Sequence, residues 1–457
     1  MRFNSFPATD EDEEGDVRIA VIGAGVSGMG SAWLLSSAHS VDVFEAEGYL
    51  GGHANTVDVH VDGTDLAVDT GFMVFNHRTY PNLVGVFKLL GVQEQPSNMS
   101  FGMHCGADEM EWSSHNLSTL FAQRRNVLRP EMWSMLLDVG RLSFSAQRLL
   151  DDPSLENITL GELLERDGYG NSFIQFYLLP MAAAIWSTRA DQILEFPAAT
   201  FLRFCDNHGL LHVTGKPHWK TVRGGARTYV QKLREGISGD VQTGVPAARV
   251  TRERGGATIE LADGATHHYD QVVLGTHADT SLSLLSDPSD EEREILGAFP
   301  YTPNAALLHS DPSFMPENRS LWASWNYDSE GCELDATGLS VTYWLNRLQN
   351  HPVPTPILVT INPRREPRED LVFDRFSYSH PNFDSRAIAA QRRLHEIQGR
   401  QDTWYCGAWQ RYGFHEDGLL SAVNLASGFG IKPPWLEPET EPAPFFNPAR
   451  VPETAEA

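Results

Sequence analysis

A glycine-rich turn near the start of the chain constrains the fold more than any other sequence feature. Residues 23–28 read GAGVSG and match the pattern G-x-G-x-x-G. The β-branched run 17–22 before them predicts a strand, and the apolar spacing of residues 27–36 predicts a helix. Residues 41–44 predict the next strand, which completes a β-α-β unit with parallel strands. The sequence therefore predicts an α/β fold that starts with this unit.

The glycines of this turn have separate physical roles. Gly23 permits the tight turn, Gly25 lets the backbone approach a pyrophosphate, and Gly28 lets the helix pack closely on the strand. The helix N-terminus, at Val26 and Ser27, offers free N–H groups and a partial positive charge to the phosphates. A dinucleotide is therefore the expected ligand.

A carboxylate and a second pair of glycines narrow the choice of dinucleotide. Glu45, followed by Ala46, ends the second predicted strand, where a carboxylate binds the ribose hydroxyls that NAD and FAD both carry. Gly51 and Gly52, followed by His53, would let the backbone pass close to a cofactor that extends across the sheet. These residues favour FAD.

The segment 407–418 predicts a second contact with the cofactor. A strand at 403–407 leads through a glycine-containing loop to a helix at 419–427. N–H groups at the start of that helix would stabilise negative charge on a reduced flavin ring. A capping cluster formed by His415, Glu416 and Asp417 is the alternative interpretation of the same residues.

The length of 457 residues and the alternation of patterns predict a Rossmann-type FAD-binding domain with a discontinuous α+β substrate domain. The strand-like segments 17–75, 216–300 and 401–432 are assigned to the FAD-binding domain. The largely helical segment 76–215 and the irregular segment 301–400 are assigned to the substrate domain. Residues 1–16 are expected to be a disordered acidic tail and residues 433–457 a flexible tail.

Composition argues against several classes of protein. A net charge of -25 argues against nucleic-acid binding and against strong polybasic attraction to anionic lipid. The four cysteines lie far apart and predict neither a disulfide framework nor a zinc site. No run approaches the roughly 18 apolar residues of a membrane span, and the acidic start does not fit a secretory signal. We expect a cytoplasmic protein without a transmembrane segment, with peripheral contact at a membrane left open.

Residues 17–52 resemble the entry of the flavin-containing amine oxidase and phytoene desaturase superfamily. Residues 68–72 (VDTGF) resemble the superfamily segment that passes near the isoalloxazine, which implies cofactor contacts from Asp69, Thr70 and Gly71. Residues 223–226 (RGGA) resemble another landmark beside the cofactor. The sequence departs from the superfamily at Ala408, where an Asp that contacts the ribitol is common.

Longer strings resemble a narrower group. Residues 69–76 (DTGFMVFN), 196–201 (FPAATF) and 412–418 (YGFHEDG) look like those of the predicted NAD/FAD-binding proteins associated with cyclopropane fatty-acyl synthases. That group is similar to flavin enzymes that desaturate or isomerise fatty acyl chains. The resemblance therefore implies a lipid or fatty acyl substrate and a cyclopropane fatty-acyl synthase-like methyltransferase as a candidate partner.

These patterns define the candidate site. The predicted proton acceptors are Tyr412, His415 and Glu416. No metal is predicted, because Gly209 separates the nearby histidines His208 and His212 and no acidic ligand adjoins them. The predicted cofactor-binding residues are Gly23, Gly25, Val26, Ser27, Gly28, Glu45, Ala46, Gly51, Gly52, His53, Asp69, Thr70, Gly71, Gly407, Asp417, Gly418 and Leu419.

Two other functions stay open. A flavin amine oxidase of this superfamily usually has a lysine near the flavin, for which Lys216 and Lys220 are the possible positions. A non-catalytic FAD-binding accessory protein of a lipid methyltransferase is the other alternative. Reduction of the bound flavin by an amine, a fatty acid or neither would separate the three.

Overall fold

Five parallel strands surround the glycine turn, in the order β10-β2-β1-β14-β20. The computed structural model describes residues 17–106, 110–186, 190–211, 217–329 and 340–436. Residues 19–22 of the central strand are all buried, which explains the apolar run that predicted it. The strands span Arg18–Ile22 (β1), Ser40–Phe44 (β2), Val241–Gln242 (β10), Gln271–Leu274 (β14) and Thr403–Tyr405 (β20).

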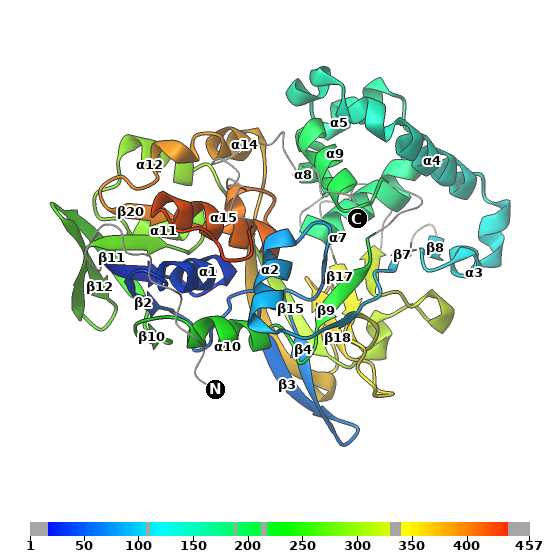
Figure 1. Cartoon of the computed structure of the whole chain (residues 1–457). Coiled ribbons are helices and arrows are strands. Elements are labelled where there is room, and N and C mark those ends of the chain that lie inside the picture. The colour runs from blue at the N-terminus through cyan, green and yellow to red at the C-terminus, as the bar shows by residue number, and fades with distance from the viewer. Residues whose placement is uncertain (1–16, 107–109, 187–189, 212–216, 330–339, 437–457) are drawn as a thin grey trace.

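Two helices cross closely beside this sheet (Figure 1). They are α1 (Val26–Leu35) and α15 (His415–Gly428). A Cβ at Gly30 would lie 2.8 Å from Cδ1 of Leu419, and one at Gly418 would lie 2.7 Å from Cγ1 of Val26. Glycine on each helix therefore permits the close crossing. The crossing packs a helix from late in the sequence against the first helix.

Helix α2 (Pro81–Leu90) packs on the nucleotide lobe, although the predicted domain boundary placed it in the substrate domain. It falls in the segment 76–215, yet its Leu83 and Phe87 share a hydrophobic core with α1 and with Tyr229 of α10 (Arg227–Glu235). The apolar face of α2 packs on the nucleotide lobe, so this lobe extends past residue 75.

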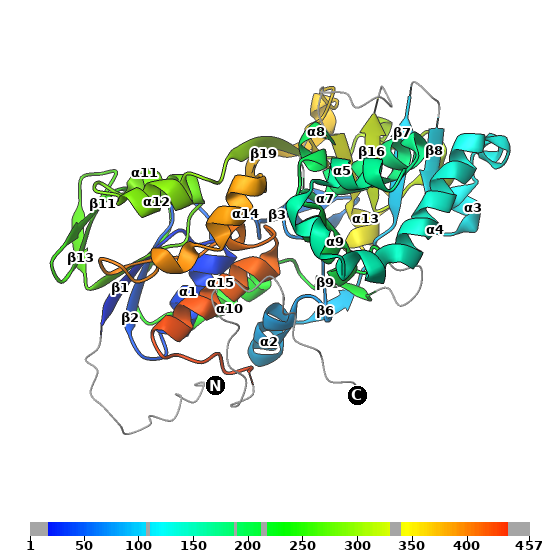
Figure 2. The ribbon, with the colours of Figure 1, turned by 90° about the horizontal axis from the view of Figure 1, so that it is seen from above.

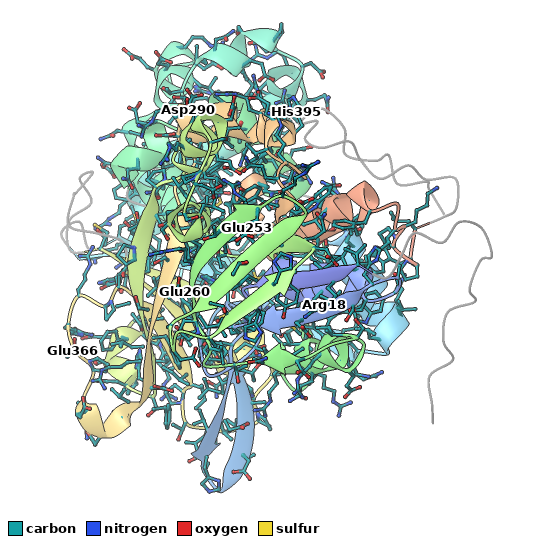
Figure 3. The ribbon with its side chains drawn as sticks, turned by 90° about the vertical axis from the view of Figure 1, so that its left-hand side faces the viewer. Arg18, Glu253, Glu260, Asp290, Glu366 and His395 are labelled. Atoms are coloured by element: carbon teal, nitrogen blue, oxygen red, sulfur yellow. The ribbon has the colours of Figure 1, made fainter. Side chains whose placement is uncertain are left out.

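Smaller antiparallel sheets flank the parallel one. Figure 3 shows β11, β12 and β13 facing the viewer, with Glu253 and Glu260 labelled on β11 and β12. The first sheet contains Ala247–Glu253 (β11), Gly256–Leu261 (β12) and Thr266–Tyr269 (β13). A separate hairpin contains Thr56–Val61 (β3) and Thr64–Asp69 (β4). A third sheet, of order β5-β9-β6, contains Phe75–Asn76 (β5), Glu94–Pro96 (β6) and Trp219–Val222 (β9).

A mixed sheet of seven strands forms the second lobe, in the order β19-β15-β18-β17-β16-β7-β8. Helices gather on one side of it (Figure 2). The strands span Phe101–Cys105 (β7), Met110–Ser113 (β8), Tyr301–His309 (β15), Trp325–Ser329 (β16), Ser340–Trp344 (β17), Leu358–Ile361 (β18) and Val372–Pro381 (β19). The helices include α3 (Leu117–Leu120), α4 (Pro130–Leu150), α5 (Leu160–Arg166), α7 (Leu179–Trp186), α8 (Ala190–Leu194) and α9 (Ala198–Asn207). The strands of this sheet fall in the segments 76–215 and 301–400.

Proline explains an irregular helix at 171–186. A short helix, α6 (Asn171–Phe173), continues through a π-helical turn at Ile174–Leu178 into α7. Pro180 has no N–H to donate to the carbonyl of Phe176, and the indole Nε1 of Trp112 donates to that oxygen at 3.2 Å instead. This part of the segment predicted to be largely helical is therefore helical with a local distortion.

The predicted C-terminal tail begins with packed residues. Trp435 stacks on Trp33, with ring centroids 6.2 Å apart, and its Nε1 donates to Oδ1 of Asn82 at 3.1 Å. Residues 433–436 are thus part of the fold, whereas 1–16 and 437–457 lie outside the described residues. No helix in the described ranges has the length and apolar character needed to cross a membrane.

The cysteines differ in state. Cys205 and Cys406 are buried and free. Cys105, at the end of β7, is disulfide-bonded, although the wide spacing of the cysteines predicted no disulfide framework. Spacing along the chain failed here because folding decides which residues adjoin.

Candidate active site

The turn between β1 and α1 has the geometry of a phosphate cradle. Gly23 has a φ of +95°, which favours glycine, and a Cβ at Gly28 would overlap the carbonyl oxygen of Gly23. At Gly25 a Cβ would meet no described atom within 4 Å, and no side chain from the described part of the chain caps α1. The first N–H groups of the helix, at Val26 and Ser27, therefore suit an anion.

Glu45 lies against this turn. Its carboxylate accepts hydrogen bonds from the backbone N–H of Ala24 at 2.6 Å and of Glu47 at 2.9 Å. The exposed Ala46 adjoins it. The carboxylate is thus held at the edge of the cradle, where the adenosine ribose of a dinucleotide would bind.

The second glycine pair completes the cradle. The N–H of Gly51 donates to the carbonyl of Ala24 at 2.8 Å, and a Cβ at Gly52 would lie 3.2 Å from the Cα of Gly25. His53 follows, half-buried, and its buried Nε2 atom has no hydrogen-bond partner among the described residues. Burial holds the pKa of His53 well below its ordinary value. A buried nitrogen without a partner beside an open cradle fits a polar cofactor, so these residues suit FAD.

A cluster of rings surrounds His53. The centroids of His277 and His380 lie 6.3 and 5.3 Å from that of His53, and Tyr378 lies at 5.0 Å. Burial lowers the pKa of His380 to about 4, so the cluster is uncharged at neutral pH. The sequence did not predict this cluster, because its members come from three distant segments. The one available signal was the place of His277 after a buried strand.

Hydrogen bonds from the protein itself occupy the carboxylate of Asp69. It accepts hydrogen bonds from the backbone N–H of Ala226 at 2.9 Å and from Nε2 of Gln349 at 2.7 Å. Burial raises its pKa to about 7. Asp69 therefore fixes the turn 223–226, and through that turn the start of α10.

Thr70 and Gly71 lie beside the ring cluster. Oγ1 of Thr70 is 2.7 Å from the hydroxyl of Tyr378, and a Cβ at Gly71 would overlap the carbonyl oxygen of His53. The structure thus brings both residues to His53, next to the second glycine pair.

The segment that returns to the cradle is held by its own polar groups. The N–H of Gly407 donates to Oγ of Ser421 at 2.9 Å. Oδ2 of Asp417 accepts from the N–H of Phe414 at 3.0 Å, and burial raises the pKa of Asp417 to about 6. Asp417 therefore caps α15, as the alternative interpretation of this cluster predicts, while Gly418 and Leu419 contact α1.

His415 lies between two aromatic residues. Its ring stacks on Phe72, with centroids 3.8 Å apart and planes 8° apart, and its Nε2 hydrogen-bonds to the hydroxyl of Tyr229. Burial lowers the pKa of His415 to about 3. The imidazole is therefore neutral.

Glu416 faces α2. One carboxylate oxygen accepts from the backbone N–H and the side-chain Nδ2 of Asn82, at 2.9 and 2.8 Å, and the other accepts from the N–H of Leu83 at 3.0 Å. Burial raises its pKa to about 8. These three contacts satisfy the first turn of α2.

Aromatic rings form a wall next to these residues. The ring of Phe204 has its centroid 4.4 Å from that of Trp186 and 4.8 Å from that of Phe414. His208 stacks on the same ring at 4.0 Å, and burial lowers its pKa to about 4. Tyr412 adjoins Phe204 edge-on at 5.9 Å. The wall is apolar and uncharged, and α9 and the loop before α15 supply most of it.

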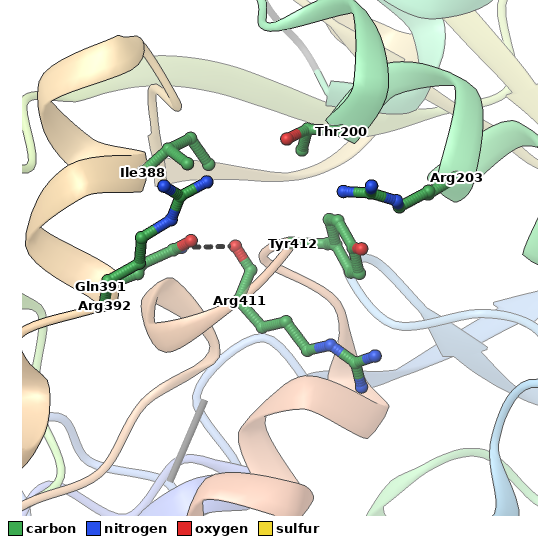
Figure 4. Close-up of a pocket in the computed structure, with 7 residues that line it drawn as sticks. All are labelled: Thr200, Arg203, Ile388, Gln391, Arg392, Arg411 and Tyr412. Atoms are coloured by element: carbon green, nitrogen blue, oxygen red, sulfur yellow. Dashed lines mark hydrogen bonds between the residues drawn. The ribbon is translucent and has the colours of Figure 1, made fainter. Parts of the chain in front are cut away.

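A small pocket lies at one end of the wall (Figure 4). Arginine side chains approach it from α9, from the residue that follows α14 (Ser385–Gln391), and from the loop before α15. Nε2 of Gln391 donates to the carbonyl of Arg411 at 2.5 Å, which joins α14 to that loop. The pocket is lined by Thr200, Arg203, Ile388, Gln391, Arg392, Arg411 and Tyr412.

Only one histidine of the pair considered for metal binding lies in the described residues. Nδ1 of His208 contacts the carbonyl of Phe204 at 2.9 Å, and His212 lies outside the described residues. Within the ranges that the structure covers, no three histidine, cysteine or acidic side chains form a cluster suited to a metal.

The parallel sheet, the glycine cradle and the closing helix define a dinucleotide-binding flavoprotein. A family model described as flavin containing amine oxidoreductase matches residues 26–371. The chain belongs to that family, and it is an FAD-dependent oxidoreductase. A search of curated proteins finds no match.

Solved structures share the fold at low sequence identity. A CLA-producing fatty acid isomerase from P. acnes has a TM-score of 0.65 at 15% identity, over 91% of this chain and 99% of that chain. Putrescine oxidase bound to putrescine has 0.64 at 13%, over 91% and 99%. Cyclohexylamine oxidase from Brevibacterium oxydans has 0.61 at 14%, over 91% and 100%. The likeness shows the fold and does not select a substrate.

Proposed function

We propose that this oxidoreductase acts on a hydrophobic substrate and desaturates or isomerises a fatty acyl chain by hydride transfer to the flavin N5. The uncharged aromatic wall carries the proposal. Trp186, Phe204 and Phe414 form a ring cluster without a charged group, in which Trp186 and Phe204 are buried and the half-buried Phe414 supplies the accessible surface. Such a surface suits a hydrocarbon chain, which offers no polar atom to recognise.

When bound, FAD supplies the hydride acceptor. Desaturation removes a hydride from one carbon and a proton from its neighbour, so it needs a proton acceptor as well as re-oxidation of the cofactor by an external electron acceptor. Isomerisation removes an allylic hydride and returns it to the other end of the allyl unit, so the double bond moves with no net oxidation. It needs no proton acceptor.

The candidate proton acceptors favour isomerisation. Three N–H donors already occupy the carboxylate of Glu416, and the pKa of His415 is about 3. Burial raises the pKa of Tyr412, so its phenol is neutral. Of these three, we assign His415 and Tyr412 to positioning the substrate beside the flavin and excluding water, and Glu416 to holding the loop.

The arginine pocket supports a free fatty acid over a phospholipid. Arg203, Arg392 and Arg411 approach it, against the carboxylates of Glu156 and Asp417 nearby. A fatty acid with its carboxylate among the arginines would direct its chain along Phe204 toward the flavin.

The amine oxidase alternative has less support. Nζ of Lys220 donates to Glu94 at 2.9 Å on β9, so it is engaged in an ion pair, and Lys216 lies outside the described residues. The carboxylate of Asp417 caps α15. The described aromatic wall therefore has no acidic group that would bind an ammonium ion. The accessory role beside a lipid methyltransferase rests on the sequence resemblance. A cytoplasmic location is proposed from the sequence composition alone.

Anaerobic incubation of the FAD-loaded protein tests the proposal. An unsaturated fatty acid, a phospholipid and putrescine would be added separately while the visible flavin absorbance and the double-bond positions are measured. The proposal predicts acyl-chain change with the fatty acid and no bleaching with putrescine. Bleaching by the amine alone would support an amine oxidase, and no reaction with copurification of a methyltransferase would support the accessory role.

A further inference from the structure

Large apolar side chains gather on one outer face of the second lobe. Of the seven exposed large apolar residues in the described ranges, six lie between residues 117 and 144, and Leu89 is the exception. Leu128 is 87% exposed, Leu137 73% and Phe144 92%. We call this set the α3–α4 surface; its members are Leu117, Val127, Leu128, Trp133, Leu137 and Phe144.

The α3–α4 surface is continuous. Trp133, Leu137 and Phe144 are spaced four and seven residues apart on α4, so they share one face of the helix. The ring of Phe121 lies 5.6 Å from that of Trp133, which connects α4 to the residues after α3. Figures 1 and 2 show α3 and α4 at the outer edge of the molecule, away from α1 and α15.

Folding does not require this surface to be apolar. The opposite face of α4 already supplies the core contacts, through Met132, Met135, Leu142 and Leu149, which are buried. Exposed side chains as large as Phe144 contribute nothing to that core. A contiguous apolar face of this kind marks an interaction site.

The charge around the surface selects its partner. The segment 117–150 has five arginines against Glu131 and Asp138, within a chain of net charge -25. The whole-chain charge predicted weak attraction to anionic lipid, but the charge is unevenly distributed and is locally positive beside the apolar residues. The arginines are Arg124, Arg125, Arg129, Arg141 and Arg148.

We propose that the α3–α4 surface docks the protein on an anionic membrane. Trp, Leu and Phe would enter the headgroup region, and arginines would contact lipid phosphates while α4 lies parallel to the membrane plane. The acidic remainder of the chain would be repelled, which fixes one orientation. This proposal concerns binding and stands independently of the reaction.

The surface also adjoins the aromatic wall. Oγ of Ser143, on α4, donates to the carbonyl of Leu211, just after α9, and α9 supplies Phe204 to the wall. One helix layer thus separates the membrane-facing residues from the proposed acyl site. Docking at α4 would place that site next to the bilayer.

Cosedimentation of the full-length FAD-loaded protein with vesicles tests the proposal. Vesicles of phosphatidylcholine alone would be compared with vesicles that also contain phosphatidylglycerol, at low and high salt. We expect binding to the anionic vesicles that weakens with salt. Leu137→Ser and Phe144→Ser should each weaken partitioning about tenfold, whereas Leu89→Ser, an exposed apolar control on α2, should not. Arg124→Glu with Arg148→Glu should remove the preference for the anionic lipid.

Three results would overturn the proposal. They are no binding to anionic vesicles, equal binding by the Phe144 variant, and a wild-type dimer in sedimentation velocity that this variant dissociates. The last would show that a second copy covers the surface. A soluble short-chain acyl substrate, assayed without vesicles, distinguishes the two proposals: the surface variants should turn it over at the wild-type rate, and a failure of the wild type would count against the proposed reaction alone.

Discussion

The carboxylate of Glu416 accepts hydrogen bonds from both the backbone N–H and the side-chain Nδ2 of Asn82. This contact ties the first turn of α15 to the start of α2. Glu416 therefore acts through the relative position of these two helices.

Substitution of Glu416 separates a positioning role from a catalytic one. Glu416→Gln keeps the shape but turns an NH2 group toward N–H donors, so we expect a loss of about 2 kcal/mol in the free energy of unfolding. Urea unfolding of the FAD-loaded protein would measure it, with the exposed Glu165→Gln as control. Loss of turnover with unchanged stability and unchanged flavin spectrum would instead assign chemistry to Glu416.

Alanine at two glycines of the cradle should have different effects. Gly25→Ala adds a methyl group in open space at a φ of -68°, so the apoprotein should keep its stability while FAD affinity falls at least about tenfold. Gly28→Ala overlaps the carbonyl of Gly23 and should prevent normal folding. Fluorescence titration of FAD and thermal unfolding would measure both, with Gly140→Ala on α4 as control. Equal FAD affinity for Gly25→Ala and wild type would contradict the assigned cradle.

Acid should destabilise the protein through its buried histidines. Burial, with a contribution from Arg411, lowers the pKa of His208 from 6.5 to about 4. Between these values the unfolded chain binds a proton that the folded chain does not, so the free energy of unfolding falls as pH falls. Asp69 and Glu416 have pKa values raised to about 7 and about 8 and act in the opposite sense. Their contribution to the free energy of unfolding falls as pH rises.

The contribution of His208 is measurable by substitution. His208→Gln should remove about 2 kcal/mol of the stability loss between about pH 7 and about pH 5. Urea unfolding at both pH values gives the comparison. An unchanged pH dependence in His208→Gln would show that this imidazole is not buried neutral.

The arginine pocket makes a prediction about the substrate head. Arg392→Gln should raise KM for a free fatty acid about tenfold with little change in kcat, because the lost contact is remote from the reacting carbons. The methyl ester should show no such change. Arg386→Gln, on the exposed side of α14, is the control. Equal effects on acid and ester would remove the carboxylate from this pocket.

The nucleotide lobe could be predicted because its determinants are local. Gly23, Gly25 and Gly28 stand within one turn, and Glu45 follows the next strand, so strand and turn patterns place them together. Glu416 was predicted from its motif to be a proton acceptor, and its contact with Asn82 could not be predicted because no local pattern links two distant segments.

The same limit applies to the ring cluster and to the outer surface. His53 meets His277 and His380 only after both lobes have folded. The helical spacing in α4 predicts an amphipathic helix but does not say that Phe144 faces solvent, because a buried face and an exposed apolar face have similar patterns.

The position of the double bonds in a recovered acyl chain tests the proposed function most directly. The FAD-loaded protein would be incubated without oxygen with an unsaturated free fatty acid, and the double bonds of the recovered acyl chain would be located by mass spectrometry. The Gly25→Ala variant would be treated in the same way for comparison. We predict a shifted double bond with the flavin still oxidised at the end, and little product from the variant. An unaltered fatty acid, together with flavin bleaching by putrescine, would contradict the account.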